Sequence, residues 1–445
     1  MKTFQGKIAF VGASYLFVRN VIKDLARCGA FRGSELTIYD IEPEPAEVNA
    51  ALGRRISDEL GAGLSVRAVH DRADALAGAA FVVVCISVGG REAARTDIEI
   101  CRRRGCDHVI GDTIGPAAVA RSLRSVPVVA DLAGAIQRHC PAATVINFSN
   151  PMSVITATLA RNTSCPVIGL CHGSHGMVHL ISSAYGVGFD DVRLDLAGVN
   201  HFAFVMSVEV AGRKLPMAEV IDRLAEATSG REPQFRDLAT GAGLHYQVVI
   251  ELGRRLGYMP NNGDRHTAEF LPWFLHPWKK LYTRERADYD QRIRSHNELA
   301  DLCRRMARGE APIADLDKPS GESAEGIMLS LLHGPPRRYA VNVPNRGAIA
   351  GLDDEALVEV YKLVGAEGLA NEPPIVLPPH LRNLIERLVI IHEYTIQAAR
   401  TGRRDLAMQA LMLEANHPDY DGMPDMLDAL WEHNSRVLAG LGYGS

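Results

Sequence analysis

The chain has 445 residues, of which 47% are hydrophobic and 23% are charged, so it is long enough for two sizeable domains or one large α/β enzyme. Its net charge of −5 offers no excess of positive charge to neutralise a phosphate backbone, so nucleic acid is not expected as a partner. The start lacks a signal-peptide pattern, no apolar run reaches about 18 residues, and the eight cysteines form no CxxC pair. These features predict a cytoplasmic protein with no membrane partner.

The first 200 residues alternate short β-branched runs with amphipathic helical patterns, which predicts βαβ units and a parallel sheet. The expected strands are Lys7–Val11, Glu35–Tyr39, Ser65–Ala68, Phe81–Ile86, Thr144–Phe148 and Pro166–Leu170. The expected helices are Val18–Arg27, Pro45–Leu60 and Pro116–His139, the last with a kink or break at Pro127.

The pattern changes in the second half of the chain. Val192–Val210 is expected to form strands again, and beyond about residue 212 helical patterns dominate, notably Leu381–Arg400 and Leu406–Glu414. We therefore expect a first domain over residues 1–200 and a second, helix-rich domain over residues 201–445.

The segment KIAFVGASYLFVRNVIKDL is typical of a strand, a glycine turn and a helix, and the next strand, LTIYD, ends in Asp40. In dinucleotide-binding folds such a turn places helix N–H groups against the pyrophosphate, and the acidic residue accepts hydrogen bonds from the ribose. Only Gly12 remains of the GxGxxG pattern, and Ser14 stands where the second glycine would be. By itself the motif supports nucleotide binding and an ordinary turn about equally, and Asp40 favours NAD over NADP.

Two further strand ends point to the same edge of the sheet, where ligands of open α/β sheets bind. FVVVCISVGGRE leaves a strand at Ser87, and VINFSNPM leaves one at Asn147–Asn150. Taken singly, Gly89–Gly90 is explained by an ordinary turn and Asn150–Pro151 by a turn initiator. Their shared position indicates a site.

A metal site is suggested by Cys171, at the end of the strand in PVIGLCHGSHG, and by His201, 30 residues later in GVNHF. A thiolate and an imidazole are good ligands for a borderline divalent ion, although a buried cysteine and a core histidine explain such a pair more often.

The segment GDRHTAEFLPWF places four ionisable residues in apolar, aromatic surroundings: Asp264, Arg265, His266 and Glu269. Such residues suit a catalytic base and a substrate clamp. A helix N-cap at Asp264, followed by a solvated face, has about equal support.

Together these segments resemble glycoside hydrolase family 4, the NAD- and metal-dependent glycosidases, and within it the α-galactosidase, α-glucosidase and α-uronidase branch. The matching segments run in the family's order from residue 7 to about residue 352: KIAFVGAS, DIEP, VVVCISVGG, GDTIGP, NFSNPMSV, GLCHG, AGVNHF, GDRHTAEFLPWF and NVPNRGAIAGL. The resemblance implies a Rossmann-like, doubly wound parallel sheet related to lactate and malate dehydrogenases. It also implies a mixed C-terminal domain for substrate, metal and oligomerisation, and a homodimer or homotetramer.

The resemblance also implies a redox-assisted reaction. NAD⁺ oxidises the C3 hydroxyl of the sugar, the ketone acidifies the C2 proton so that a base removes it, and the aglycone leaves from C1. Water then adds, and the retained NADH reduces C3. A divalent metal, usually Mn²⁺, acts as a Lewis acid on the C2 and C3 oxygens. Such enzymes do not use the paired carboxylates of most glycosidases, and we find no such pair in this sequence.

The matching positions imply a role for individual residues. Cys171 and His201 become the metal ligands, Asp264 becomes the base, and His172, or less favourably His175, protonates the leaving oxygen. The expected cofactor contacts are Gly12, Ala13, Ser14, Asp40, Ser87 and Asn147. The expected substrate contacts are Asn150, His175, Arg265, Asn342 and Asn345.

The sequence departs from the family at two places. The nucleotide turn reads GAS where the family usually has GAGS, which bears on cofactor affinity more than on cofactor identity. CHGS after the sixth strand excludes phospho-glycosidases best and favours uronides, and Arg265 offers a bidentate clamp for a carboxylate. We expect an α-glycosidase acting on small α-glycosides or α-uronides, with α-glucuronides or α-galacturonides favoured. The alternatives are an α-galactosidase or α-glucosidase of the same family, a sugar or hydroxy-acid dehydrogenase, and a catalytically silent NAD-binding sensor.

Overall fold

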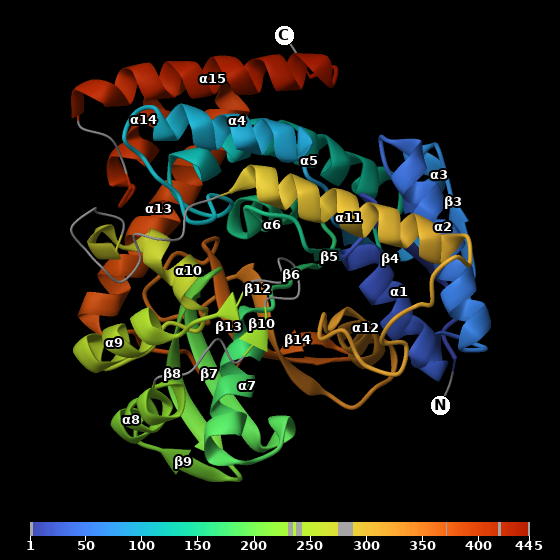
Figure 1. Cartoon of the computed structure of the whole chain (residues 1–445), viewed down its shortest axis with the longest axis horizontal. Coiled ribbons are helices and arrows are strands. Elements are labelled where there is room, and N and C mark those ends of the chain that lie inside the picture. Colours follow the sequence, from blue (N-terminus) through green and yellow to red (C-terminus); the bar gives the residue numbers. More distant parts are fainter. Residues whose placement is uncertain are drawn as a thin grey trace.

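The computed structural model describes residues 3–229, 235–236, 243–274, 288–370, 372–416 and 420–443. Within them a 12-stranded sheet has the order β3-β2-β1-β4-β5-β6-β12-β13-β7-β8-β9, with β14 (Gly368–Ala370) paired to β13 (Figure 1). Its parallel part consists of β1 (Lys7–Val11), β2 (Glu35–Tyr39), β3 (Ser65–Ala68), β4 (Ala79–Val84), β5 (Thr144–Asn147) and β6 (Val167–Gly169). The strand order 3-2-1-4-5-6 is that of a doubly wound dinucleotide-binding sheet, and it confirms the predicted fold class.

Helices cover both faces of the parallel strands, which is why these strands are apolar throughout. Alternate residues of β1 point to opposite faces, so Ile8 and Phe10 belong to one buried cluster, and Ala9 and Val11 belong to another. The first cluster includes residues of α1 (Phe17–Arg27), α2 (Pro43–Glu59) and α4 (Gly90–Arg102). The second includes residues of α3 (Arg72–Leu76), α5 (Pro116–His139) and α6 (Met152–Asn162). The helix α5 continues past Pro127 and is not broken there.

The second half of the chain adds antiparallel strands to the same sheet. They are β7 (Val192–Val199), β8 (Phe202–Val210), β9 (Arg213–Leu215), β12 (Arg337–Pro344) and β13 (Leu357–Gly365). β12 and β13 lie between β6 and β7, so the sheet continues across both halves. Helices do dominate beyond residue 212, as expected, but β12 and β13 were not expected there. The predicted boundary after residue 200 falls at the tip of the β7–β8 hairpin, and the division into two domains stays a prediction.

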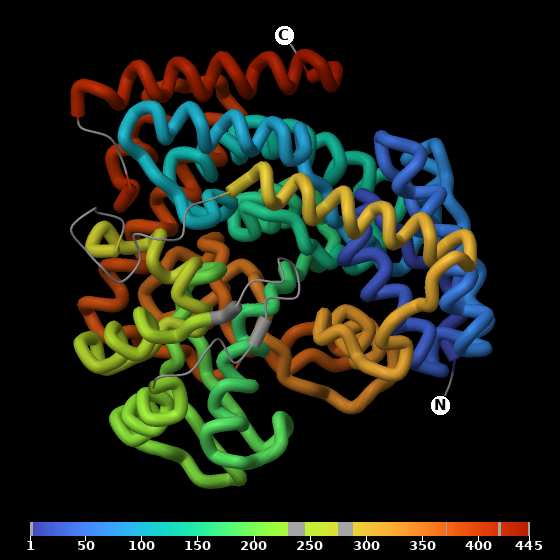
Figure 2. Tube along the Cα trace, in the orientation of Figure 1, coloured from blue at the N-terminus to red at the C-terminus, as the bar shows by residue number. Residues whose placement is uncertain are grey.

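The last helices return over the first half of the molecule. They are α13 (Pro379–Thr401), α14 (Arg404–Leu413) and α15 (Met423–Gly440), and α15 lies along α4 and α5 (Figures 1 and 2). A buried network anchors α15, because Arg124 of α5 donates to Asp97 of α4 and to Asn434 of α15. The helix α11 (Tyr289–Ala307) crosses α2 and α4. In the described part of the chain, every helix is too short or too polar to span a bilayer.

Candidate active site and metal site

Three side chains from distant segments meet beyond the carboxyl ends of the parallel strands. Asp112 precedes α5, His201 lies at the tip of the β7–β8 hairpin, and His266 belongs to α10 (Asp264–Thr267). Their ligand atoms all lie within 4.8 Å of one another, and the ring centroids of His201 and His266 are 3.9 Å apart. We call these three residues the Asp–His–His cluster. A carboxylate and two imidazoles form a donor set suited to a divalent cation.

The electrostatics of the cluster favour the protonation states that bind metals. Burial opposes ionisation of Asp112, but the combined electrostatic attraction of His266, His201, Arg292 and Arg121 outweighs it and lowers the pKa of Asp112 to about 2. Burial, followed by repulsion from His201, lowers the pKa of His266 well below its usual range. At neutral pH the cluster therefore presents an ionised carboxylate and a neutral His266 imidazole.

The position of His201 is held by a buried carboxylate that sequence analysis missed. Oε2 of Glu359, in β13, accepts hydrogen bonds from the backbone N–H of His201 at 3.2 Å and from Nδ2 of Asn200 at 3.4 Å. Oε1 of Glu359 accepts from Asn261 at 3.0 Å, and the Thr113 hydroxyl lies 3.0 Å from Nδ1 of His201. These contacts stabilise a histidine whose φ of +65° lies in the left-handed region, where non-glycine residues are uncommon.

Cys171, predicted as a metal ligand, follows β6 and lies beside Asn200, the neighbour of His201 in the chain. Burial raises the pKa of its thiol to about 12. Within the described residues, the tight grouping around His201 contains Asp112 and His266 and does not include Cys171. The ligand role of Cys171 stays a prediction, whereas the sequence signal for Asp112 was the segment GDTIGP, to which no role was given.

The two histidines considered as proton donors have different surroundings. His172 lies at the start of α7 (Gly173–Tyr185), and its Nε2 is 3.0 Å from Oε2 of the buried Glu322. His175, one turn later, is largely enclosed, and burial lowers its pKa to about 4. Of the two, His172 has the carboxylate partner that stabilises an imidazolium.

Asp264, predicted as the base, is fully buried. Its Oδ1 accepts the backbone N–H of Val249 at 2.9 Å, in the first turn of α9 (Gln247–Leu256). The alternative of a solvated face after an N-cap was wrong, because Gly263 is the cap of α10, and Asp264, Thr267 and Glu269 are all buried. The structure thus gives Asp264 a helix-stabilising contact, and its catalytic role stays a prediction.

The predicted substrate contacts differ in what surrounds their amides. Nδ2 of Asn150 lies 3.5 Å from Oδ2 of Asp112, directly before a cis peptide bond to Pro151. Asn342 in β12 lies opposite Gly169 of β6, and both polar atoms of its buried side chain lack a hydrogen bond. In contrast, the side-chain amide of Asn345 is already hydrogen-bonded to the backbone of its own loop, at Ile349 and Leu352. Asn150 and Asn342 are thus the better placed to contact a ligand.

The predicted cofactor contacts gather at one edge of the sheet. Gly12 has a φ of +93°, and a Cβ atom there would lie 2.4 Å from the carbonyl oxygen of Cys85, so only glycine fits. The backbone N–H of Ala13, four residues before α1 begins, donates to Oδ2 of Asp40 at 2.6 Å. Ser87 and Asn147 follow β4 and end β5, and the amide of Asn147 is engaged with Ser149 and Thr156. Ser14 completes the turn, and its hydroxyl accepts from Phe17 at 3.4 Å.

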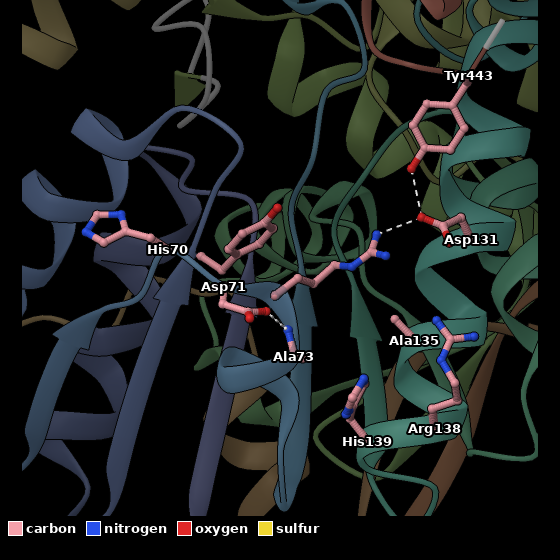
Figure 3. A pocket seen from close by; sticks show the side chains of 10 residues that line it. His70, Asp71, Ala73, Asp131, Ala135, Arg138, His139 and Tyr443 are labelled. Atoms are coloured by element: carbon pink, nitrogen blue, oxygen red, sulfur yellow. Dashed lines mark hydrogen bonds and ion pairs between the residues drawn. The ribbon is translucent and has the colours of Figure 1, made fainter.

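A separate open, polar groove of about 550 Å³ lies over α3 and the second half of α5 (Figure 3). Oδ2 of Asp131 accepts from Arg72 and from the hydroxyl of Tyr443, both at 2.8 Å, so the C-terminal tail is tied to both helices there. The groove is lined by Tyr39, His70, Asp71, Arg72, Ala73, Asp131, Ala135, Arg138, His139 and Tyr443. None of the predicted site residues lines it.

The fold and the Asp–His–His cluster define a Rossmann-like α/β protein with a candidate metal site beyond the carboxyl ends of its parallel strands. The model of the family 4 glycosyl hydrolases matches residues 7–187, and that of their C-terminal domain matches residues 196–416. The chain therefore belongs to glycoside hydrolase family 4 and is a glycosidase, which confirms the predicted family and enzyme class.

Relatives with known names cover nearly the whole chain. An α-galactosidase of Bacillus subtilis is 28% identical over 95% of this chain and 95% of its own length. An α-galacturonidase of Thermoanaerobacterium saccharolyticum is 27% identical over 91% and 90%. An α-glucosidase of Erwinia rhapontici is 26% identical over 95% and 97%.

Solved structures share the fold over the same extent. A structure described as a glucosidase of Bacillus subtilis has a TM-score of 0.86 at 26% identity, covering 96% of this chain and 99% of its own. A 6-phospho-α-glucosidase from gut microorganisms, in complex with NAD and Mn²⁺, has a TM-score of 0.82 at 22% identity, covering 98% and 99%. Malate dehydrogenase of Plasmodium falciparum has a TM-score of 0.51 at 13% identity, covering 90% and 99%, which agrees with the predicted relation of the folds.

Proposed function

We propose that the protein is an NAD- and Mn²⁺-dependent α-glycosidase of small α-glycosides or α-uronides, with α-galacturonides or α-glucuronides favoured. The observation that carries this proposal is the Asp–His–His cluster, which lies beyond the carboxyl ends of the parallel strands, as the turn of Gly12 and Asp40 also does. Relatives named α-galacturonidase and α-galactosidase, and a structural neighbour in complex with NAD and Mn²⁺, support it. The predicted dimer or tetramer is part of the same proposal.

The side chains present fit both groups. Asp112, His201 and His266 would hold the metal, since carboxylates suit Mn²⁺ and imidazoles suit most divalent ions, and Cys171 remains a further proposed ligand. The turn at Gly12, where a Cβ atom has no room, and the carboxylate of Asp40 would hold the nucleotide. When bound, NAD would exchange a hydride with C3 of the sugar, and the metal would polarise the oxygens on C2 and C3.

The remaining roles belong to side chains of this chain. Asp264 would take the C2 proton, and His172, oriented by Glu322, would give a proton to the leaving oxygen. Arg265 would bind the carboxylate of a uronide, and a bidentate guanidinium contact would favour such a substrate over a neutral sugar. Asn150 and Asn342 would contact sugar hydroxyls, as the unpartnered polar atoms of Asn342 permit.

Hydrolysis is expected to require both NAD⁺ and Mn²⁺ and yet to produce no net NADH, because the hydride taken from C3 is returned. The measurement is release of p-nitrophenol from a panel of p-nitrophenyl α-glycosides and α-uronides, with and without NAD⁺, Mn²⁺ and thiol, while NADH is followed by absorbance. If one NADH accumulated for every molecule of product released, this result would contradict the glycosidase mechanism and favour a dehydrogenase. The panel also decides between uronides and neutral sugars.

Replacing Cys171 with serine is expected to weaken Mn²⁺ binding at least about tenfold, because serine cannot supply a thiolate. The same thiol should make the wild-type activity sensitive to air and recoverable with thiol plus Mn²⁺. The measurement is Mn²⁺ affinity and turnover of Cys171→Ser, with Cys101→Ser as control, because Cys101 is also a free thiol but lies buried in α4, whereas Cys171 is partly exposed. If Mn²⁺ affinity and turnover are unchanged in Cys171→Ser, Cys171 is not a ligand and the Asp–His–His cluster remains as the proposed metal site.

A further inference from the structure

A buried carboxylate with no assigned role lies behind the Asp–His–His cluster. Glu269, in the short helix η3 (Ala268–Phe270), is only 2% exposed. Its Oε1 accepts hydrogen bonds from three consecutive backbone N–H groups, at 2.8, 2.9 and 3.0 Å: those of Val109, Ile110 and Gly111. The loop that Glu269 holds therefore curls around a single carboxylate oxygen.

Such an arrangement makes the carboxylate the organising group of the loop. Successive backbone N–H groups that converge on one point form a concave anion site, and bonds to an ionised acceptor are stronger than neutral ones. The opposite side of the loop is also held, because Arg292 and Tyr289 of α11 donate to the carbonyl oxygen of Ile110 at 3.2 and 3.4 Å. With Glu269 removed, three buried N–H groups would lose their acceptor at once.

The two segments joined by Glu269 are those that supply the ligand candidates. Asp112 follows directly on the held loop, and His266, in α10, precedes Glu269 of the adjoining η3 by three residues. The hydrogen bonds of Glu269 thus connect the backbone next to one ligand candidate with the backbone next to the other. The third member, His201, is held separately by Glu359.

We propose that Glu269 is a positioning residue for the metal site, which sets the distance between the Asp112 carboxylate and the His266 imidazole. This inference rests on the proposed function, because it assumes that these side chains bind the metal. Residues that orient the ligands of a metal typically change its affinity 10- to 100-fold when replaced. A residue that only stabilises the fold would lower the melting temperature and leave the affinity of the folded protein unchanged.

The test is the affinity of the full-length protein for Mn²⁺, measured by electron paramagnetic resonance of free and bound Mn²⁺ in the presence of NAD⁺. Glu269→Gln keeps the size of the side chain and removes its charge, and it is expected to weaken Mn²⁺ binding 10- to 100-fold and to alter the spectrum of bound Mn²⁺. Glu269→Asp keeps the charge on a shorter side chain, and its affinity for Mn²⁺ is expected to lie between those of Glu269→Gln and wild type. It also serves as the second variant if Glu269→Gln does not fold.

The matched control is Asp97→Asn. Asp97 is as buried as Glu269, at 1% exposed, but its partners are Arg124 and Asn434, in the anchor of α15. This variant is expected to lower thermal stability without changing Mn²⁺ affinity. Folded Glu269 variants that bind Mn²⁺ as wild type does, with an unchanged spectrum, would overturn the inference.

The same titration distinguishes failure of the inference from failure of the proposed function. If wild type binds no Mn²⁺, the proposed metal site itself is wrong, and this result does not depend on any Glu269 variant. If wild type binds Mn²⁺ but hydrolyses none of the glycosides, the proposed activity fails, whereas the affinities still decide the role of Glu269.

Discussion

Replacing His201 with alanine is expected to lower kcat/KM by about 10³-fold or more and to remove high-affinity Mn²⁺ binding. His201 is the residue common to the Asp–His–His cluster and to the predicted Cys171–His201 pair, so both arrangements lose a ligand. Loss of Lewis-acid stabilisation worth several kcal/mol, at about 1.4 kcal/mol per factor of ten, gives this magnitude. The measurement is kcat/KM on the best p-nitrophenyl substrate at saturating NAD⁺, together with the dissociation constant for Mn²⁺.

A second substitution separates ligand loss from backbone strain. His201 has a φ of +65°, a conformation that asparagine tolerates better than alanine. His201→Asn should therefore be more stable than His201→Ala but equally poor in Mn²⁺ binding. If His201→Asn retains wild-type affinity and turnover, His201 is not a ligand.

The cluster members beyond His201 decide which set of ligands holds the metal. Asp112→Asn keeps the shape of the side chain and removes its charge, and it is expected to cost at least about tenfold in Mn²⁺ affinity. The companion variant, His266→Ala, is expected to do the same. If both variants bind Mn²⁺ normally while Cys171→Ser does not, the metal lies between Cys171 and His201.

Turnover in D₂O is expected to place deuterium at C2 of the released sugar, because the proton removed from C2 exchanges with solvent before one is returned. Asp264→Asn removes the proposed base and should lower kcat by about 10²-fold or more, the usual contribution of a general base. NAD⁺ and Mn²⁺ should still bind to the variant. The measurements are mass spectrometry of the product and steady-state kinetics of the variant.

The buried position of Asp264 calls for a control, because its Oδ1 also accepts the N–H of Val249 at the start of α9. Asparagine keeps a side-chain oxygen acceptor, so Asp264→Asn retains much of this contact. Asp288→Asn is the control for the helix contact alone, since the exposed Asp288 caps α11 by accepting the N–H of Gln291 at 2.9 Å. It is expected to cost about 1 kcal/mol of stability or less and to leave kcat unchanged.

The outcomes of this experiment separate the mechanism from the identity of the base. Product without deuterium would reject chemistry at C2 altogether. Deuterated product from a fully active Asp264→Asn variant would retain the mechanism and move the base elsewhere, first to Tyr258 or His266. In that case Asp264 would be left with its structural contact to α9.

The local elements of the first half were predictable because each depends on neighbours in the sequence. The bounds of β1, β2, β3 and α5 agree with those expected, because short apolar runs between turn residues favour strands and Pro116 favours the first position of a helix. The turn at Gly12 was likewise predictable, because a glycine between a strand pattern and a helix pattern favours a tight turn. Family membership followed from contiguous segments that can be recognised one at a time.

The strands β12 and β13 were missed for a physical reason. The first begins with two arginines and ends in a proline, and the second carries Glu359 and Lys362, which sequence patterns assign to surfaces. Both charged side chains are buried in the structure. Burial of Glu359 is tolerated because Asn200, Asn261 and the backbone N–H of His201 donate hydrogen bonds to it. These partners come from other segments of the chain.

The doubly wound half, the glycine turn at Gly12 and the family could all be predicted from the sequence. Only the tertiary structure brought Asp112 and His266 to His201 and revealed Glu269 behind them. The reason is that Val109 and Glu269 are 160 positions apart, and spacing along the chain carries no information on a distance set by the packing of separate segments. Hydrogen bonds between a buried carboxylate and distant backbone N–H groups exist only once the chain has folded.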